Sequence, residues 1–176
     1  MKRITLLLVA AVVLTAGSLL LIRNQQSVRI ESESTSVQSS LSRLENLSDR
    51  SVVTLLVNED PLQVEVVKTA ESITLGLSGR SEIGRDGMLF ILPTQRIATF
   101  WMKDMLFDLD MIWIDEDKII SITADVSAPP ALTASQSAPK LPTYSSIVPV
   151  THVLEVPAGT AREKNWQIGA PVVITR

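Results

Sequence analysis

The chain has 176 residues and a formal net charge of −3, and 45% of its residues are hydrophobic, which suits one globular domain with additional segments. It contains no Cys, so disulfides, thiolate catalysis, Fe–S clusters and thiolate zinc sites are excluded. The acidic balance and the lack of a dense basic patch lead us to expect no nucleic-acid partner.

An uncharged apolar run over residues 4–22 follows Lys2 and Arg3, and Arg23 ends it. At about 1.5 Å per residue, this run matches the hydrocarbon core of a bilayer. It is either a secretory signal peptide, cut near residues 16–18, or an uncleaved signal anchor. We favour a single-pass anchor because the run continues well beyond that cut. In both cases the positive-inside rule predicts that the remainder lies outside the cytoplasm, in the periplasm or extracellular space, or is secreted if the leader is cleaved.

Residues 24–50 are rich in Ser, Gln and Glu and lack aromatic residues. Such a segment cannot bury enough apolar area to offset its ordering entropy, so it is predicted to be a flexible tether. Leu41, Leu44 and Leu47 recur every three residues, which allows a short amphipathic helix as an alternative. Residues 51–176 are then the globular domain.

The first half of this domain has the pattern of a hairpin followed by a helix. Residues 52–57 and 62–67 read as strands around a turn that ends at Pro61. Residues 69–77 suit a short helix with Thr69 as N-cap and Gly79 beyond its end. A polar loop over 78–86 leads to the next strand.

The second half is predicted to be mostly short strands. Residues 88–92 form a strand that Pro93 stops, and 99–102 form another. Residues 109–114 and 119–124 form a second hairpin. A long loop with four prolines spans 125–146. The last elements are a strand over 153–156, a helix that Thr160 caps and that runs to about 166, and a strand over 171–174. The expected fold is α+β: a small β-rich domain with a mostly antiparallel, barrel-like sheet and two short helices.

Taken in order, these elements resemble the bacterial and archaeal family known as domain of unknown function 192. Eight segments carry the resemblance. In chain order they are Gly76-Leu77-Ser78-Gly79-Arg80, Asp86-Gly87-Met88-Leu89-Phe90, Phe100-Trp101-Met102-Lys103-Asp104, Leu109-Asp110-Met111-Ile112-Trp113-Ile114-Asp115, Tyr144-Ser145-Ser146, Val153-Leu154-Glu155, Ala158-Gly159 and Ile168-Gly169. The resemblance implies a compact β-rich α+β fold over roughly residues 52–175 and no established activity. This chain has Asp104 where the family usually has Asn, and Asp108 where it usually has Pro.

Charges set in apolar sequence are the first candidates for a site, because buried charge is costly unless it is paired or functional. Arg80 and Lys103 are the candidate cations for an anionic ligand, since a guanidinium can bind a carboxylate or phosphate bidentately. Arg80 could equally pair with Asp110 or Asp104 inside the protein. Asp104, Asp110 and Tyr144 complete the predicted ligand-binding set.

Asp108 and Asp110 are two residues apart and would share one face of a strand. Paired carboxylates can hold Mg²⁺ or Ca²⁺ or divide into acid and base, with Asp104 as a further ligand. Alternatively, Asp108 lies in a turn and backbone N–H groups satisfy Asp110. His152 is the single histidine. As a general base it would need a partner such as Glu155, and packing is the alternative. No specific metal or cofactor motif is present, so we expect none.

Three functions remain open. The first is a membrane-tethered extracytoplasmic module that binds a small polar or anionic ligand through Arg80, Lys103 and Tyr144. The second is an accessory protein of the envelope, with the 125–146 loop as its docking segment. The third is a carboxylate-based hydrolase, with or without a divalent ion. We rank binding above catalysis because no nucleophile, base and oxyanion donor can be assembled from the sequence.

Overall fold

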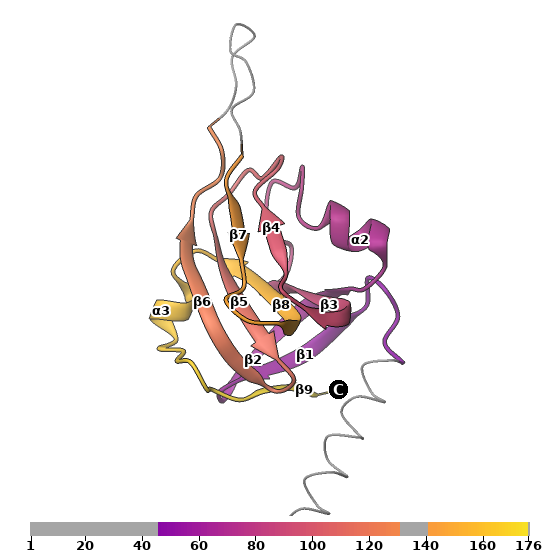
Figure 1. The fold of residues 1–176 in the computed structure, drawn as a ribbon, viewed down its shortest axis with the longest axis vertical. Helices are drawn as coiled ribbons and strands as arrows, with labels where there is room; N and C mark the ends of the chain where they lie inside the picture. Colours follow the sequence, from indigo (N-terminus) through magenta and orange to yellow (C-terminus); the bar gives the residue numbers. More distant parts are fainter. Residues whose placement is uncertain (1–45, 131–140, 176) are drawn as a thin grey trace, which may run out of the picture. The chain divides into compact units, whose positions relative to one another are not determined.

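The computed structural model describes residues 46–130 and 141–175, and the described residues from Leu47 onward form one compact unit (Figure 1). The predicted anchor and most of the predicted tether lie outside the described residues. The elements in chain order are β1 (Val52–Val57), β2 (Asp60–Val67), α2 (Ala70–Leu75), β3 (Gly87–Arg96), β4 (Thr99–Trp101), β5 (Leu109–Asp115), β6 (Lys118–Val126), β7 (Thr143–Ser145), β8 (Val150–Pro157), α3 (Thr160–Glu163) and β9 (Val172–Thr175). In the described part of the chain, no helix has the length and apolar character needed to span a membrane.

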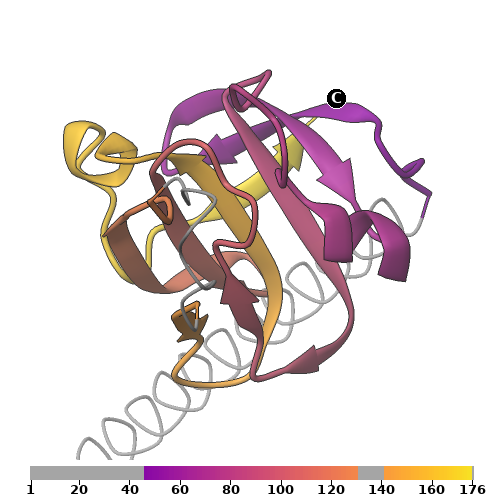
Figure 2. The same cartoon turned by 90° about the horizontal axis from the view of Figure 1, so that it is seen from above.

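Seven strands form one curled sheet in the order β6-β5-β8-β3-β2-β1-β9 (Figures 1 and 2). All its neighbouring pairs are antiparallel except β2 and β3. An isolated antiparallel bridge joins Lys118, at the start of edge strand β6, to Pro171, just before edge strand β9. The two edges of the sheet therefore meet at one end. The small β-rich fold with a curled sheet and two short helices agrees with the sequence prediction.

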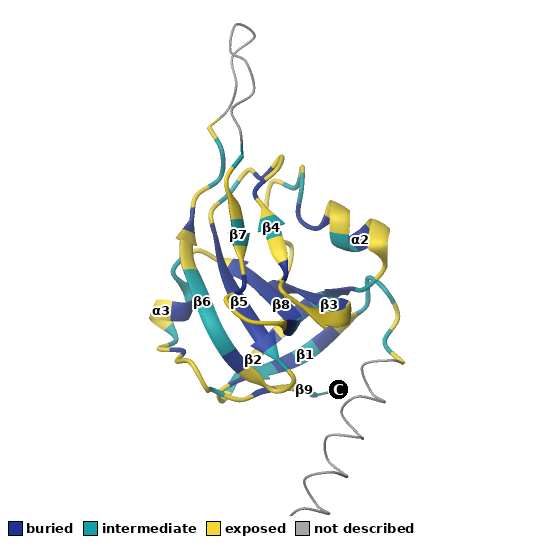
Figure 3. Cartoon of the chain, in the orientation of Figure 1, coloured by how far each residue is buried: buried dark blue, intermediate teal, exposed yellow. Residues whose placement is uncertain are grey.

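Both faces of the central strands are buried, which explains the nearly continuous apolar sequence of β5. Ile112 and Ile114 belong to a core that α3 and the curled sheet enclose. Met111 and Trp113 point the other way, into a second core that includes Leu77 and partly buried residues of β4 and β7. Figure 3 shows α2, β4 and β7, with many exposed residues, next to the largely buried sheet. A strand buried on two sides needs apolar residues at every position rather than at alternate ones.

Among the strands, β3, β7 and β8 differ most from the prediction. Strand β3 continues past Pro93 to Arg96, because its ladder with β8 is irregular between Ile91 and Arg96, and a proline without an N–H is tolerated where a ladder is interrupted. Strand β7 lies within the predicted loop and pairs with β4 as a separate two-stranded sheet. Strand β8 begins three residues before the predicted strand, so it includes His152.

The two helices differ in how closely they follow the sequence. Thr69 caps α2 as predicted, through a reciprocal pair with Ser72. Helix α3 is a single turn that ends at Glu163, and its N-cap is Gly159 rather than Thr160. Gly159 adopts φ 85 and has no side chain to cap with. The acceptor for the free N–H groups comes instead from Asp110 of β5.

The folded unit begins before Ser51. The carboxylate of Asp49 accepts hydrogen bonds from the backbone N–H of Lys68 at 2.8 Å and from the hydroxyl of Ser72 at 2.7 Å. Leu47 packs against the enclosed core. Residues 47–50 were predicted to be part of the tether. These contacts attach them to the domain.

Candidate functional site

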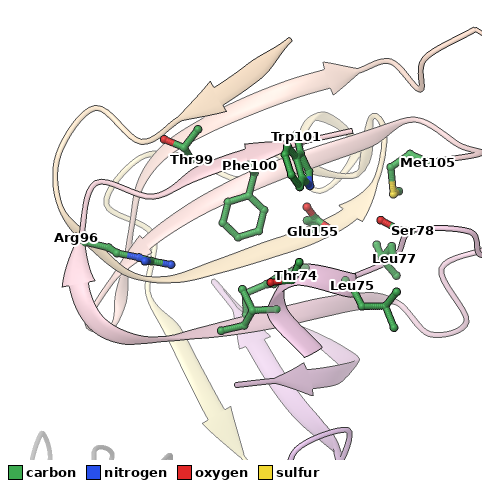
Figure 4. A pocket seen from close by; sticks show the side chains of 13 residues that line it. Thr74, Leu75, Leu77, Ser78, Arg96, Thr99, Phe100, Trp101, Met105 and Glu155 are labelled. Carbon is green, nitrogen blue, oxygen red and sulfur yellow. The ribbon is translucent and has the colours of Figure 1, made fainter. Parts of the chain in front are cut away.

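A pocket of about 220 Å³ lies between α2 and β4, above the outer face of the curled sheet (Figure 4). It is open to solvent on one side. Its lining comes from α2 and the turn after it, from β3, from β4 and the loop after it, and from β8. The lining residues are Ile73, Thr74, Leu75, Gly76, Leu77, Ser78, Phe90, Arg96, Thr99, Phe100, Trp101, Met105 and Glu155.

Glu155 is the acidic residue of this pocket, and strand pairing places it there. It lies opposite Met88 of β3 and opposite Met111 of β5. Because alternate residues of a strand share a face, Glu155 points to the same side as Val153, towards the second core. Gly87 allows β3 to approach closely, since a Cβ at this position would lie 2.7 Å from the backbone oxygen of Glu155.

The Glu155 carboxyl group is buried and has no partner. Its residue is only 4% exposed, and no hydrogen bond to its carboxyl group occurs within the described part of the chain. No side-chain oxygen there is both sealed from solvent and unpaired, so the carboxyl oxygens open onto the pocket. Burial raises the pKa of Glu155 to about 8, because an apolar environment disfavours the charged form.

The walls of the pocket are aromatic. Phe100 of β4 packs edge-to-face on Phe90, with ring centroids 4.9 Å apart, and edge-to-face on Trp113, with centroids 5.8 Å apart. Trp101 follows Phe100 and stays 51% exposed, so it borders the pocket at its rim. Figure 4 shows Glu155 on the Trp101 side of the pocket and Arg96 at the opposite end.

The hydroxyl groups of the pocket already have partners. Thr74 donates to the backbone oxygen of Ala70 at 2.7 Å, and Ser78 donates to that of Lys103 at 2.8 Å. The Thr99 hydroxyl pairs with that of Ser145 at 2.8 Å. Among the lining side chains in the described residues, the polar groups that make no side-chain hydrogen bond are the Glu155 carboxyl, the Arg96 guanidinium and the indole N–H of Trp101.

Arg80, a predicted ligand residue, is part of an ion-pair network outside this pocket. Its guanidinium donates to both carboxylate oxygens of Glu65, at 2.7 and 3.0 Å. Arg50 donates to the same carboxylate at 2.8 Å. The hydrogen bonds from Arg80 are the main cause of the lowered pKa of Glu65. The partner of Arg80 is thus Glu65, rather than either Asp110 or Asp104.

Lys103 and Asp104 lie together in the exposed turn after β4. The Lys103 Nζ is 6.0 Å from the centroid of the Trp101 ring. Asp104 adopts φ 56, a left-handed conformation that Asp and Asn tolerate better than most residues. Its backbone oxygen accepts from the N–H of Gly79 at 2.8 Å. This turn therefore contacts the segment that contains Arg80, although neither Lys103 nor Asp104 lines the pocket.

Asp110 is fully buried and satisfied by backbone groups, which is one of the two predicted alternatives. It accepts from the N–H groups of Asp125, Gly159 and Ala161, at 2.8, 3.1 and 2.9 Å. Asp108 is exposed and accepts from the N–H of Ala128 at 2.7 Å. Within the described ranges, no three Asp, Glu or His residues are grouped as metal ligands would be.

Tyr144 and His152 both lie packed within the domain, Tyr144 half-buried and His152 buried. Tyr144 of β7 is half-buried opposite Phe100 of β4 and packs against the second core. His152 is buried, its Nδ1 lies 2.8 Å from the Thr151 hydroxyl, and burial lowers its pKa to about 4. His152 and Glu155 are three residues apart on β8, so they point to opposite faces, and Glu155 is not placed as the partner that His152 would need to act as a general base.

None of the five predicted ligand residues, Arg80, Lys103, Asp104, Asp110 and Tyr144, lines the pocket, and their role in binding stays a prediction. From the sequence, Glu155 was expected as a possible partner for His152 and as part of a family-matching segment, and Arg96 was not a candidate. A signal for Glu155 was nevertheless available. It is a single acidic residue between Leu154 and Val156 in an apolar strand, and such a charge needs a reason to be buried.

The fold and the pocket define a small β-rich domain with a solvent-open, aromatic-walled pocket over a curled sheet. The chain belongs to the domain of unknown function 192 family, described as DUF192, uncharacterized ACR, whose model matches residues 53–174. This result confirms the resemblance. No curated protein matches the chain.

Two solved structures are similar to this one. A protein of unknown function from Novosphingobium aromaticivorans DSM 12444 is 25% identical, with a TM-score of 0.61, over 72% of this chain and 88% of that chain. A protein from Sinorhizobium meliloti 1021, described as a "putative transcription regulator", is 25% identical, with a TM-score of 0.59, over 73% of this chain and 98% of that chain. Each similarity covers nearly three quarters of this chain and leaves the rest unmatched.

Proposed function

We propose that the domain is a binding module for a small polar ligand, held by its N-terminal segment on the extracytoplasmic side of a membrane. The observation that supports binding is the unpartnered, buried carboxyl group of Glu155, which opens onto a pocket with aromatic walls. A concave, largely apolar site with a few convergent polar groups is the usual form of a small-molecule site. A buried carboxyl without a partner costs stability, and a ligand would supply the missing interaction.

Binding explains the pocket better than hydrolysis does. The hydrolase alternative assigns chemistry to Asp104, Asp108 and Asp110. Backbone N–H groups already occupy the carboxylates of Asp108 and Asp110, and none of the three lines the pocket. Acid–base catalysis at Glu155 would need a second reacting group beside it, and the other titratable lining residue, Arg96, lies at the opposite end.

The experiment for binding is an NMR titration of the ¹⁵N-labelled full chain, in a neutral sugar-headed detergent, with a set of small cations, anions and neutral polar compounds. We expect shifts at the amides of Gly76, Ser78, Thr99 and Glu155, and weaker binding in Trp101→Leu. Ile168→Ala is the control, because Ile168 is another exposed apolar residue and does not line the pocket. The absence of any pocket shift with all three ligand classes would refute the proposal.

The apolar run at residues 4–22 and the preceding Lys2 and Arg3 support the extracytoplasmic location. Treating spheroplasts with an external protease tests it. We expect digestion of the domain in intact spheroplasts. Protection until the spheroplasts are lysed would place the domain in the cytoplasm and contradict this part of the proposal.

A further inference from the structure

We infer that the Glu155 pocket takes an organic ammonium ion, with its cationic head at the Glu155 carboxylate and its carbon body against Phe100 and Trp101. This inference rests on the proposed binding function and names the class of ligand. Glu155 is a residue only 4% exposed, and its carboxyl group lacks a partner in the described residues and faces the pocket. An ammonium group is a direct electrostatic complement to a carboxylate in such surroundings.

The walls favour a cation as well. The faces of aromatic rings carry negative charge density and attract a cation within about 6 Å of the ring centroid, most strongly for Trp. Phe90, Phe100 and Trp101 all line the pocket. The chain itself places an ammonium group near one of them, since the Lys103 Nζ is 6.0 Å from the Trp101 centroid. A ligand head of the same chemistry would meet both Glu155 and an aromatic wall.

The pocket offers fewer favourable interactions to an anion than to a cation. Arg96 is the one positively charged residue among those that line it, and it lies at the end opposite Trp101 (Figure 4). Arg80, the stronger anion-binding candidate from the sequence, is held by Glu65. A carboxylate or phosphate next to Glu155 would be repelled by its charged form and would contact the negative faces of the rings. The described residues therefore favour a cation over an anion, which is one of the ligand classes expected from the sequence.

Ammonium binding would be coupled to release of a proton. Burial raises the pKa of Glu155 to about 8, so in the empty pocket near pH 7 the group is mainly the neutral acid. A quaternary ammonium ion has no proton to exchange. When such an ion binds, the Glu155 carboxylic acid therefore loses its proton to water. The resulting carboxylate pairs with the cation.

The other charged groups near Glu155 are not expected to release the proton when the ammonium ion binds. On the elements packed around it, these are Glu71 of α2, Arg96 of β3, Asp110 and Asp115 of β5, His152 of β8, and Lys103 and Asp104 after β4. Only Arg96 lines the pocket. Burial is the cause of the raised pKa of Glu155, so the pH dependence of binding between pH 6 and 8 would report on this residue.

The test compares three ligands of similar shape: choline, its neutral analogue 3,3-dimethylbutan-1-ol, and the anion 3,3-dimethylbutyrate. Isothermal titration uses the full chain in a neutral sugar-headed detergent at pH 6, 7, 8 and 9, in two buffers with different ionisation enthalpies. We expect choline to bind about tenfold or more tightly than the alcohol at pH 9. Its affinity should fall about tenfold per pH unit below pH 8, with release of about one proton at pH 7.

Two variants locate the effect. Glu155→Gln should remove both the preference for choline and its pH dependence, whereas Glu82→Gln, at an exposed glutamate of the loop before β3, should change neither. If Glu155→Gln does not fold, the pH slope and proton release of the unaltered chain, with Trp101→Leu as the second variant, still decide the matter.

The outcomes separate the two proposals. Equal or tighter binding of the alcohol or the butyrate, or choline binding that does not change with pH, would overturn the ammonium assignment and leave the binding function in place. No binding of any of the three ligands, together with no pocket shift in the NMR titration, would overturn both.

Discussion

The carboxylate of Asp110 accepts a hydrogen bond of 2.9 Å from the backbone N–H of Ala161, a residue 51 positions later in the chain. Asp110 belongs to β5 and Ala161 to the single-turn helix α3. The cap of this helix therefore comes from a distant strand, because Gly159 at the N-cap position has no side chain to provide it. A carboxylate that looks like a metal ligand in the sequence thus serves the fold.

Replacing Asp110 by Ala should be costly. The change leaves three backbone N–H groups, two of them at the start of α3, without their acceptor. We expect the free energy of unfolding to fall by roughly 3 kcal/mol, measured by chemical denaturation. Asp108→Ala is the control, since exposed Asp108 accepts one hydrogen bond, and it should cost about 1 kcal/mol. A melting temperature that rises with Mg²⁺ only when Asp110 is present would contradict this structural role.

Glu155 should make the domain progressively less stable as pH rises from about 4.5 to about 8. The folded-state pKa is about 8, above the ordinary value of 4.5, so the folded state binds more protons than the unfolded state between these values. The free energy of unfolding should fall with rising pH, by up to about 1.4 kcal/mol per unit. The clearest window is pH 6.5–8, above the ordinary pKa of His152. Urea unfolding should show this slope, and Glu155→Gln should remove it.

His152 should act in the opposite direction at lower pH. Burial lowers its pKa from 6.5 to about 4, so the unfolded state binds more protons in that range. Its contribution to the free energy of unfolding should increase as pH rises from 4 to 6.5. The Glu155 contribution opposes it above pH 4.5, so the His152 effect is best measured in Glu155→Gln. Adding His152→Gln to that variant should flatten the remaining slope, and an unchanged slope would assign it to other groups.

Arg80→Ala should lower stability without affecting the pocket. The change removes a bidentate partner from Glu65, whose side chain is only 16% exposed. We expect a loss of roughly 1–2 kcal/mol in the free energy of unfolding. Arg85→Ala, at an exposed arginine of the same loop, is the control and should cost less than 0.5 kcal/mol or so, about the effect of an ordinary surface substitution. Loss of choline binding in Arg80→Ala, with normal folding, would bring Arg80 back as a ligand residue.

Gly87→Ala should disturb the pairing of β3 with the part of β8 that carries Glu155. The added Cβ would lie 2.7 Å from the backbone oxygen of Glu155, and a paired strand cannot easily move away. We expect a loss of roughly 3 kcal/mol in stability and broadened amide signals around Glu155. Gly79→Ala provides the comparison, because Gly79 has φ 73 and open space around it. That variant should cost about 1–2 kcal/mol for its backbone conformation alone, with the pocket signals unchanged.

Local signals in the sequence predict most of the elements. The turn residues between β1 and β2 and the Thr69 cap of α2 act within a few positions, and the structure confirms both. The boundaries that differ depend on distant contacts. Strand β3 passes through Pro93 because its ladder with β8 is interrupted there, and α3 begins at Gly159 because Asp110 reaches it.

The pocket was harder to predict than the elements around it. Its walls come from α2, β3 and β4, and its carboxyl group from β8, and no spacing in the sequence shows that β8 lies between β5 and β3. The charges around Lys103 attract attention because they are close together in the sequence. Glu155, alone in an apolar strand, is recognisable as unusual, and only the strand order shows what it faces.

The junction between the two edges of the curled sheet has a consequence for behaviour at high concentration. The backbone groups of Ile119 exchange hydrogen bonds of 3.0 and 2.8 Å with Ala170 and Gly169, and the N–H of Val172 donates to Asp117 at 2.7 Å. Exposed strand edges are templates on which other chains can add strands and begin to aggregate. At this end of the sheet, backbone groups of the two edges are already hydrogen-bonded to each other. The domain should therefore resist fibril growth from this end.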